Sequence, residues 1–358
     1  MIVHYTRDIQ SASGMLSSKE LLLSRIGSLD SQNDILHYLK EFNRLHYMQD
    51  LISTFQQALV MISTMPGVNQ QQFFMHTLTA AQLRKQAYQA GVSLEGSLSR
   101  VLKQNSYVAS FTEEVAASFP STACGEIAFV FDGNPLRAPR GFELLFNKVH
   151  YADAEKVDRL QAAGGDNLAK FMESISQEPG MSYAGILAAY IKRLEKQQQA
   201  YAGIIHEIID ELSSKDQTDA YTPLDYKSHE GAVDAIHSRI VEEYTTLFRQ
   251  ETGQKPLTKN EIKQRLKDHP EMAESTWLSI RSVLVKDEAF KAENEVRAVL
   301  LPQSKEQFNQ TKKQLPVGFD TGLLKKIVIS PSCESKAEWK AALEEALRAN
   351  KYNDVVVE

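Results

Sequence analysis

The stretch AENEVRAVLL, residues 292–301, decides how the rest of this chain is interpreted. Successive side chains of a β-strand point to opposite faces. A strand over these residues therefore presents Glu293, Glu295, Arg297 and Val299 on one face, and the apolar residues between them point into a core. Two carboxylates and a guanidinium on one face of a half-buried strand predict a functional site. The alternative is an exposed, ion-paired strand face, which would contribute less than about 1 kcal/mol to stability.

Composition places the chain among ordinary globular proteins. It has 358 residues, 24% of them charged, with a net charge of −6. A negative net charge argues against a generally basic surface that would bind nucleic acid, but it does not exclude a local basic groove. Two cysteines, Cys124 and Cys333, lie far apart, which predicts a reducing, cytoplasmic setting. The first ten residues lack the basic and apolar regions of a signal peptide. No apolar run approaches the roughly 18 residues that cross a bilayer, so we expect no membrane contact.

Periodicity predicts short strands at both ends of the chain and helices between them. Predicted helices cover residues 34–63, 69–90 and 95–104 and much of 154–280. Predicted strands cover residues 2–6, 107–112, 126–132, 143–149, 292–301, 325–330 and 354–357. We therefore expect one α+β domain over residues 1–358, with a small mixed or antiparallel sheet built from N-terminal, middle and C-terminal strands. The segment 154–280 is then a large helical insertion; two packed lobes are the alternative.

The helical insertion carries one long apolar stripe that runs from Leu187 to Leu212 at helical spacing. We expect this stripe to pack against the helix at 34–63, and a partner-binding or oligomer-forming face is the alternative. Two capping boxes are predicted, one at Thr258 and Glu261 and one at Ser335 and Glu338.

The common catalytic motifs are absent from the sequence: it has no phosphate-binding GxxxxGK[ST] loop, no GxGxxG, no HExxH and no GxSxG. The remaining candidates are polar residues on short strands or beside them. They are His4, Tyr5 and Thr6 on the first strand, Arg25 after an apolar triplet, and Ser110 near the end of the strand at 107–112. Each of them also has a purely structural interpretation.

The order of these segments resembles a large bacterial family known as domain of unknown function 2971. The segments that carry the resemblance are HYT (4–6), LLLSRIGSLDSQND (21–34), YVASFTEE (107–114), EIAFVFD (126–132), LFNKVHYAD (145–153), Lys286 and Phe290 before ENEVR (293–297), and the tail KKIVISPSCESKAEWKAAL (325–343). The arrangement also resembles, more distantly, the ADP-ribosyltransferase superfamily. It places a histidine on the first strand, a strand with a hydroxyl side chain in the middle of the chain, and a glutamate on a strand near the C-terminus.

The resemblance implies an NAD-dependent ADP-ribosyltransferase or NAD glycohydrolase, of the kind found among bacterial toxins and antiphage defence effectors. Glu295 would stabilise the ribosyl oxocarbenium ion electrostatically, and Glu293 would orient the acceptor or act as its base. The acceptor, a protein or a nucleic acid, stays unknown.

The same resemblance assigns NAD binding to further residues. His4, with Tyr5, Thr6 and Ser110, would hold NAD. Arg25 or Arg297 would pair with its pyrophosphate, or Arg297 would hold Glu295 in place.

Two other functions stay open. A non-catalytic ligand-binding or interaction protein on the same scaffold predicts that Glu295 is ion-paired with Arg297. A metal-dependent nuclease or phosphoesterase would gather Glu293, Glu295 and Asp34 around a cation. The transferase hypothesis instead predicts that His4, Ser110 and Glu295 converge on one place.

Overall fold

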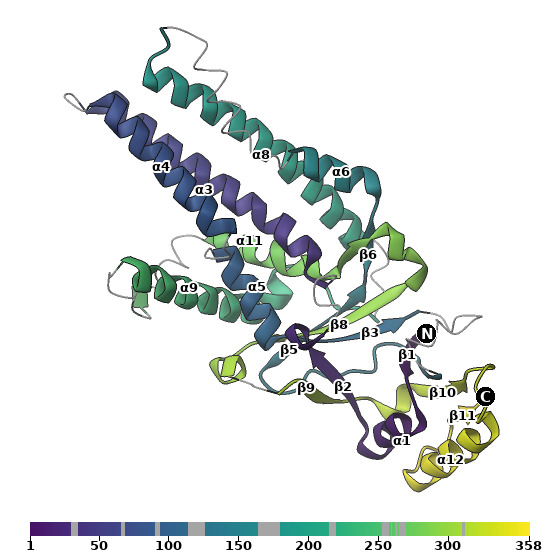
Figure 1. The fold of residues 1–358 in the computed structure, drawn as a ribbon. Coiled ribbons are helices and arrows are strands. Elements are labelled where there is room, and N and C mark those ends of the chain that lie inside the picture. Colours follow the sequence, from purple (N-terminus) through teal and green to yellow (C-terminus); the bar gives the residue numbers. More distant parts are fainter. Residues whose placement is uncertain are drawn as a thin grey trace.

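The fold is seen in a computed structural model of the chain (Figure 1). It describes residues 1–29, 35–65, 69–89, 94–113, 126–163, 180–214, 220–252, 270–309 and 312–358, together with residues 258, 260, 261 and 264. The expectation of a mixed α+β chain is confirmed. Asp34, the third carboxylate of the metal-dependent alternative, and Cys124 lie outside the described residues.

A mixed sheet forms the centre of the molecule, and the described residues contribute nine strands to it. Its strands are β1 (Ile2–Thr6), β2 (Glu20–Arg25), β3 (Tyr107–Thr112), β4 (Ile127–Phe131), β5 (Phe142–Lys148), β8 (Glu295–Pro302), β9 (Gln314–Gly318), β10 (Leu324–Ile329) and β11 (Val356–Val357). The order is β11-β10-β4-β1-β3-β2-β9, with β8 paired to β3 and β5 paired to β8. Only β10 and β11 run parallel among these pairs. The sheet thus joins the two ends and the middle of the chain, as expected, but it is larger than the small sheet predicted.

Helices lie on both sides of this sheet. They are α1 (Ile9–Ser18), α3 (His37–Thr64), α4 (Gln70–Gln89), α5 (Leu94–Asn105), α6 (Ala154–Ala163), α8 (Tyr183–Ser214), α9 (Glu230–Thr252), α11 (Pro270–Arg281) and α12 (Lys336–Ala349). Helices α1 and α12 pack together below the sheet, and the others gather above it (Figure 1). Buried residues on each face join a different hydrophobic core, for example Val299 with the upper helices and Leu300 with α1 and α12.

The helical region at 154–280 does not stand apart from the rest of the chain. Helix α8 packs along α3, and α9 packs against α5. The predicted stripe on α8 is confirmed as core, since Leu187 and Leu212 are both buried. A helical layer drawn from both halves of the sequence therefore covers the upper face of the sheet. No helix in the described ranges combines the length and the apolar character needed to cross a membrane.

Local sequence signals explain several element ends. Gly133, with a φ of 101°, follows β4, and Asn134 accepts the Leu136 amide at 3.0 Å, which closes the predicted turn. The capping box at Thr258 and Glu261 is formed. At Ser335 helix α12 begins as predicted, but the serine side chain makes no capping bond.

A short segment, residues 221–229, runs along the outer edge of β5. Thr222 donates its amide to the Phe146 carbonyl at 3.0 Å and accepts the Phe146 amide on its hydroxyl at 2.9 Å. At the end of the segment the His229 ring stacks on Trp277, with 4.6 Å between ring centroids. Its Nδ1 contacts the Glu143 carboxylate and its Nε2 lies 2.6 Å from the Pro223 carbonyl. Both ring nitrogens face acceptors, so the geometry requires the charged imidazolium.

This contact predicts a pH-dependent stability. Burial alone lowers the pKa of His229, but its bonds to Glu143 and Pro223 and the charges of Glu143 and Asp225 raise it overall above the ordinary 6.5. A raised folded-state pKa stabilises the protein below the unfolded pKa, and that stabilisation is lost as pH rises through the folded pKa. We expect the free energy of unfolding to fall above about pH 6.5. Chemical denaturation of His229→Gln should lack that slope, and the exposed control His206→Gln should keep it. Identical slopes in all three proteins would contradict the assignment.

Candidate functional site

Strand β8 begins later than the sequence pattern predicts. Residues Glu288–Glu293 form a short 3-10 helix, η4, which Asp287 caps by accepting the Ala289 amide at 3.1 Å. Asn294 then adopts a left-handed φ of 44°, a conformation that asparagine tolerates. Glu293 is therefore not a strand residue, and the prediction that alternation places it beside Glu295 is wrong. Both side chains nevertheless reach the same place, as their contacts show.

The strand is also not half-buried. All eight residues from Glu295 to Pro302 are buried, because helices cover both faces of the sheet. Glu295 is 7% exposed and Arg297 is 2% exposed. The alternative of an exposed, ion-paired strand face is therefore wrong: these two charges lie inside the protein, where an unpaired charge is costly.

The Glu295 carboxylate is held by donors from three strands. Its Oε1 accepts the Arg297 Nε at 2.8 Å and the Ser110 hydroxyl at 2.7 Å. Its Oε2 accepts the Arg297 Nη2 at 3.1 Å and the Lys286 ammonium at 3.4 Å. Arg297 also donates its Nη1 to the Val283 carbonyl. The guanidinium therefore grips the carboxylate with two parallel bonds and is itself fixed by the backbone.

Register explains why Ser110 and Arg297 meet. On β3 and β8 they stand directly opposite one another, and Thr112 stands opposite Glu295. Directly opposite residues project from the same face of an antiparallel pair. The hydroxyl and both charged groups thus lie on the upper face, at the end of the sheet where β8 begins.

A second, more exposed carboxylate lies beside this group. Lys286 donates to Glu293 at 2.5 Å, closer than its 3.4 Å contact with Glu295, and its ammonium lies 4.6 Å from the Phe290 ring centroid. The Lys286 side chain is only 11% exposed, while that of Glu293 is 47% exposed. Two acids and two bases are therefore gathered here, and their charges balance.

Tyr151 completes the group through a small separate sheet. Strands β6 (His150–Ala152) and β7 (Val285–Asp287) run parallel, with Tyr151 opposite Lys286. The Tyr151 hydroxyl accepts the Glu295 amide at 2.8 Å. Burial raises the pKa of Tyr151 to about 12, so the phenol keeps its proton at neutral pH. That proton remains available for donation next to Glu295.

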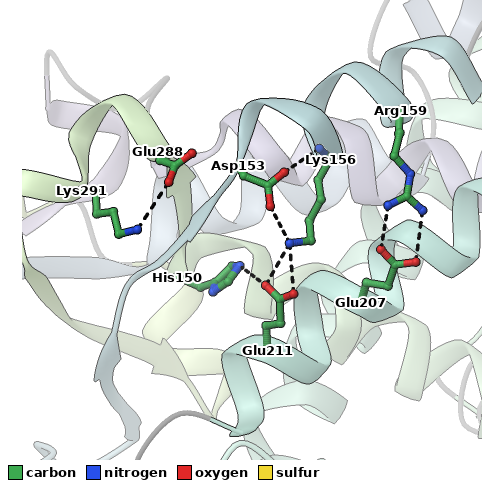
Figure 2. A network of polar contacts seen from close by, with 8 residues as sticks. All are labelled: His150, Asp153, Lys156, Arg159, Glu207, Glu211, Glu288 and Lys291. Carbon is green, nitrogen blue, oxygen red and sulfur yellow. Dashed lines mark hydrogen bonds and ion pairs between the residues drawn. The ribbon is translucent and has the colours of Figure 1, made fainter.

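Polar contacts attach this small sheet to the helices (Figure 2). His150 Nε2 lies 3.3 Å from Glu211 on α8, and Lys156 on α6 joins Asp153 at 2.7 Å and Glu211 at 3.0 Å. Further along, Arg159 pairs with both Glu207 oxygens, at 3.0 and 3.1 Å. The outer pairs are partly exposed and weak individually, but together they fix the start of α6 and the strand that carries Tyr151.

Electrostatics keep Glu295 ionised. Burial alone raises its pKa, but the Arg297 charge and hydrogen bonds, the Ser110 hydroxyl and the Lys286 charge outweigh burial and hold the pKa below its usual value. A buried carboxylate that stays charged, in a place fixed by the strands, is the feature that electrostatic catalysis or cation recognition requires.

The structure brings His4 to Ser110 from the other face of the sheet. Strands β1 and β2 pair with the same edge of β3. Strand β2 pairs with it at Tyr107 and Val108, and β1 pairs with it at Thr112. Between them the His4 Nδ1 contacts the Ser110 carbonyl at 3.2 Å. The His4 ring packs on Phe111, with 5.1 Å between centroids, on the face opposite the Ser110 hydroxyl. Burial lowers the pKa of His4, with the carbonyl bond opposing, so the ring is neutral and donates to Ser110.

The other predicted NAD-binding residues are spread more widely. Thr6 is buried and shares the His4 face, whereas Tyr5 alternates onto the face of Ser110 and is half-buried beside Val3. Arg25 on β2 stands opposite Tyr107 on β3. Tyr107 lies about 17 Å along β3 from Thr112, the residue opposite Glu295. The structure therefore does not bring Arg25 to the Glu295 group.

Sequence reasoning missed Tyr151 as a site residue and noticed Lys286 only as part of the family resemblance. Both residues reach the site because β6 pairs with β7. Each of these strands has only three residues, too few to show a period in the sequence. Among the described residues, no three His, Cys, Asp or Glu side chains are placed to hold a metal ion. The metal-dependent alternative also requires Asp34, which lies outside these residues, so it stays a prediction.

We use the name Glu295 cluster for the six residues that meet here: Ser110, Tyr151, Lys286, Glu293, Glu295 and Arg297. Comparison of the chain with protein-family models, with curated proteins and with solved structures returns no match.

Proposed function

We propose that this chain cleaves the bond between nicotinamide and ribose in NAD and transfers ADP-ribose to an acceptor or to water. The observation that carries the proposal is the Ser110 hydroxyl bonded at 2.7 Å to a buried, ionised Glu295. The hydrogen bond helps to fix the position of the carboxylate, and the lowered pKa of Glu295 means that the carboxylate stays charged. Such a group lowers the barrier for a reaction that builds positive charge on a sugar carbon.

The proposed reaction is a substitution at ribose C1′. The bond from ribose C1′ to the nicotinamide nitrogen breaks, and its electron pair leaves with nicotinamide. An acceptor oxygen or nitrogen, or water, forms the new bond to C1′ and gives its proton to Glu293. Glu293 suits this role because it is 47% exposed and open to an incoming group, while Glu295 is buried.

Other members of the cluster are supporting residues in this proposal. Arg297 and Ser110 set the orientation of Glu295. Tyr151 fixes its backbone amide and offers a phenol proton to the ligand. The contacts of His4 favour support of the β3 backbone over the direct grip on NAD expected from sequence. An enzyme that depletes NAD would suit a toxin or a defence effector.

The Lys286 ammonium donates to Oε2 of Glu295, the carboxylate oxygen that the ribose would approach in this proposal. Its 3.4 Å contact with Glu295 is the longest of the four, and its nearer partner is Glu293. We expect Lys286→Met to raise the rate of nicotinamide release about 3- to 10-fold, because the ammonium competes with the developing positive charge. Lys286→Arg keeps the charge and should stay at or below the wild-type rate. Single-turnover assays measure both, and loss of activity in Lys286→Met would contradict this role.

A second candidate function is non-catalytic ligand binding. The observation that favours it is the Glu295–Arg297 ion pair, in which each carboxylate oxygen already has two donors. The decisive experiment incubates NAD with the purified chain and follows both binding, by calorimetry, and nicotinamide release, by chromatography. Release supports the transferase or glycohydrolase proposal. Binding of intact NAD favours the second candidate, and neither binding nor release counts against both for this ligand.

A further inference from the structure

Basic residues come together at the end of the sheet where β3 begins, the opposite end from the Glu295 cluster. They are Arg25 at the end of β2, Lys103 in the last turn of α5, and Lys312 and Lys313 just before β9. The three segments that carry them, residues 24–29, 99–106 and 312–316, contain no Asp or Glu. In a chain with a net charge of −6, they form a local concentration of positive charge.

Strand register places Arg25 and Lys313 on one face of the sheet. Strands β2 and β9 are antiparallel, with Ser24 opposite Gln314. The next step along this register puts Lys313 opposite Arg25, and the Arg25 amide donates to the Lys313 carbonyl at 2.8 Å. Directly opposite residues project from the same face, with their Cβ atoms about 5 Å apart, and like charges in this position destabilise a sheet.

Tyr107 continues the same row on the next strand. It stands opposite Arg25 on β3. Burial raises the pKa of Tyr107 and the positive charge of Arg25 opposes that rise, so the guanidinium lies near the phenol. The Tyr107 hydroxyl donates to the Lys312 carbonyl at 3.2 Å, which brings the backbone of the second lysine to the same place.

Lys103 joins the group through η1 (Ile26–Ser28), the single turn that follows β2. A Cβ atom at Gly27 would lie 2.7 Å from the Lys103 carbonyl oxygen and 3.3 Å from the Lys103 Cβ. Only glycine therefore lets the turn and α5 approach this closely. The Lys103 side chain begins beside Gly27, two residues along the chain from Arg25.

The acids in the described part of the chain leave these cations without ion pairs. Lys312 and Lys313 are exposed, and Arg25 and Lys103 are partly exposed. The neighbouring Arg100 differs, because its Nε lies 3.6 Å from Glu243. The exposed large apolar side chains found in the described ranges all lie outside the three segments. A protein partner would rely on such apolar or aromatic anchors, whereas phosphate groups need only the cations.

We propose that the basic end of the sheet, defined by Arg25, Lys103, Lys312 and Lys313, binds the phosphate backbone of a nucleic-acid strand. The Arg25 guanidinium presents a planar fork that matches two phosphate oxygens, and the lysines bind phosphates as point charges. Phosphates would also relieve the repulsion between Arg25 and Lys313. The inference goes beyond NAD cleavage and does not depend on it.

The test is the binding of a labelled single-stranded oligonucleotide to the purified chain, measured by fluorescence anisotropy at several salt concentrations. Each neutralised phosphate contributes about 0.7 to the slope of log K against log salt, so four contacts predict a slope of about −3. Arg25→Gln/Lys313→Gln should reduce the slope by about 1.4 and weaken binding about tenfold or more at low salt. Polyglutamate of the same length should compete poorly, and equal competition would overturn the assignment to phosphate.

The matched control is Lys336→Gln/Lys340→Gln on α12. It also removes one partly exposed and one exposed cation and changes the net charge equally. It should bind the oligonucleotide as wild type does. A wild type that does not bind, or a control that loses as much affinity as Arg25→Gln/Lys313→Gln, would overturn the proposal.

Urea denaturation separates ligand binding from a structural role of the pair. Because the two like charges stand directly opposite one another, Arg25→Gln/Lys313→Gln should be at least as stable as wild type. A variant that unfolds at a much lower urea concentration would show that the pair supports the fold, and the proposal would fail.

Discussion

Arg297→Met is expected to lower the free energy of unfolding by about 3–5 kcal/mol, the usual cost of removing one partner of a buried ion pair. The guanidinium supplies two of the four bonds to the Glu295 carboxylate and is 2% exposed. Without it, a buried charge keeps only Ser110 and Lys286. Urea denaturation at neutral pH measures the loss.

The matched control is Arg159→Met. Arg159 also grips a glutamate with two bonds, but its side chain is 45% exposed and that of Glu207 is 47% exposed. An exposed ion pair contributes little to stability because water screens its charges, so Arg159→Met should lose much less stability than Arg297→Met. If both variants lose the same stability, burial of the Arg297 pair is not what makes it important.

The pH dependence of the free energy of unfolding, measured for wild type and Arg297→Met, tests the same ion pair a second time. In the wild type the pKa of Glu295 is depressed, so its stabilisation is present above the unfolded pKa of about 4.5 and is lost as pH falls through the folded value. In Arg297→Met, burial should dominate and raise the pKa of Glu295. The variant should then recover stability relative to wild type as pH falls, and a gap between the two proteins that does not change with pH would contradict this.

Glu295→Gln is expected to lower the rate of nicotinamide release at least 100-fold, the size of effect seen when one electrostatic catalyst is removed. The amide keeps the shape of the side chain and removes its charge. It also leaves Arg297 without a counter-ion, so the variant should be less stable. Rates must therefore be compared at a temperature where circular dichroism shows both proteins folded.

Ser110→Ala separates orientation from charge in the same assay. It leaves the Glu295–Arg297 pair intact and removes only the 2.7 Å bond to the carboxylate. Its loss of rate should be smaller than that of Glu295→Gln. If Ser110→Ala and wild type release nicotinamide equally fast, the hydroxyl has no part in the reaction.

Much of the fold follows from local sequence patterns. The aromatic and β-branched runs predict β3, β4 and β5 to within a residue or two, and the apolar stripe on α8 predicts a buried helix. The stripe on α8 is informative because one buried helix face imposes one period, whereas these strands are recognised as short aromatic and β-branched runs bounded by turns. Strands β2 and β9 were not identified, because their pairing with each other joins residues some 300 positions apart in the sequence.

The site could be predicted only in part, for the same physical reason. Alternation along 292–301 correctly pairs Glu295 with Arg297 on one face. It fails at Glu293, where the left-handed Asn294 ends a short helix before the strand begins. Tyr151 enters the site because β6 and β7 pair across more than 130 residues, and His4 turns to the opposite face because of the register of β1 with β3 and β4. Tertiary register decides these positions, and no local pattern encodes it.

The most direct test of the central claim is the fate of NAD incubated with the purified wild-type chain, with Glu295→Gln in parallel. We predict that wild type releases one nicotinamide for each NAD consumed, and that the folded variant releases at least 100-fold less. NAD that remains intact with the wild type, or nicotinamide release that continues undiminished in Glu295→Gln, would contradict the claim that Glu295 cleaves this bond.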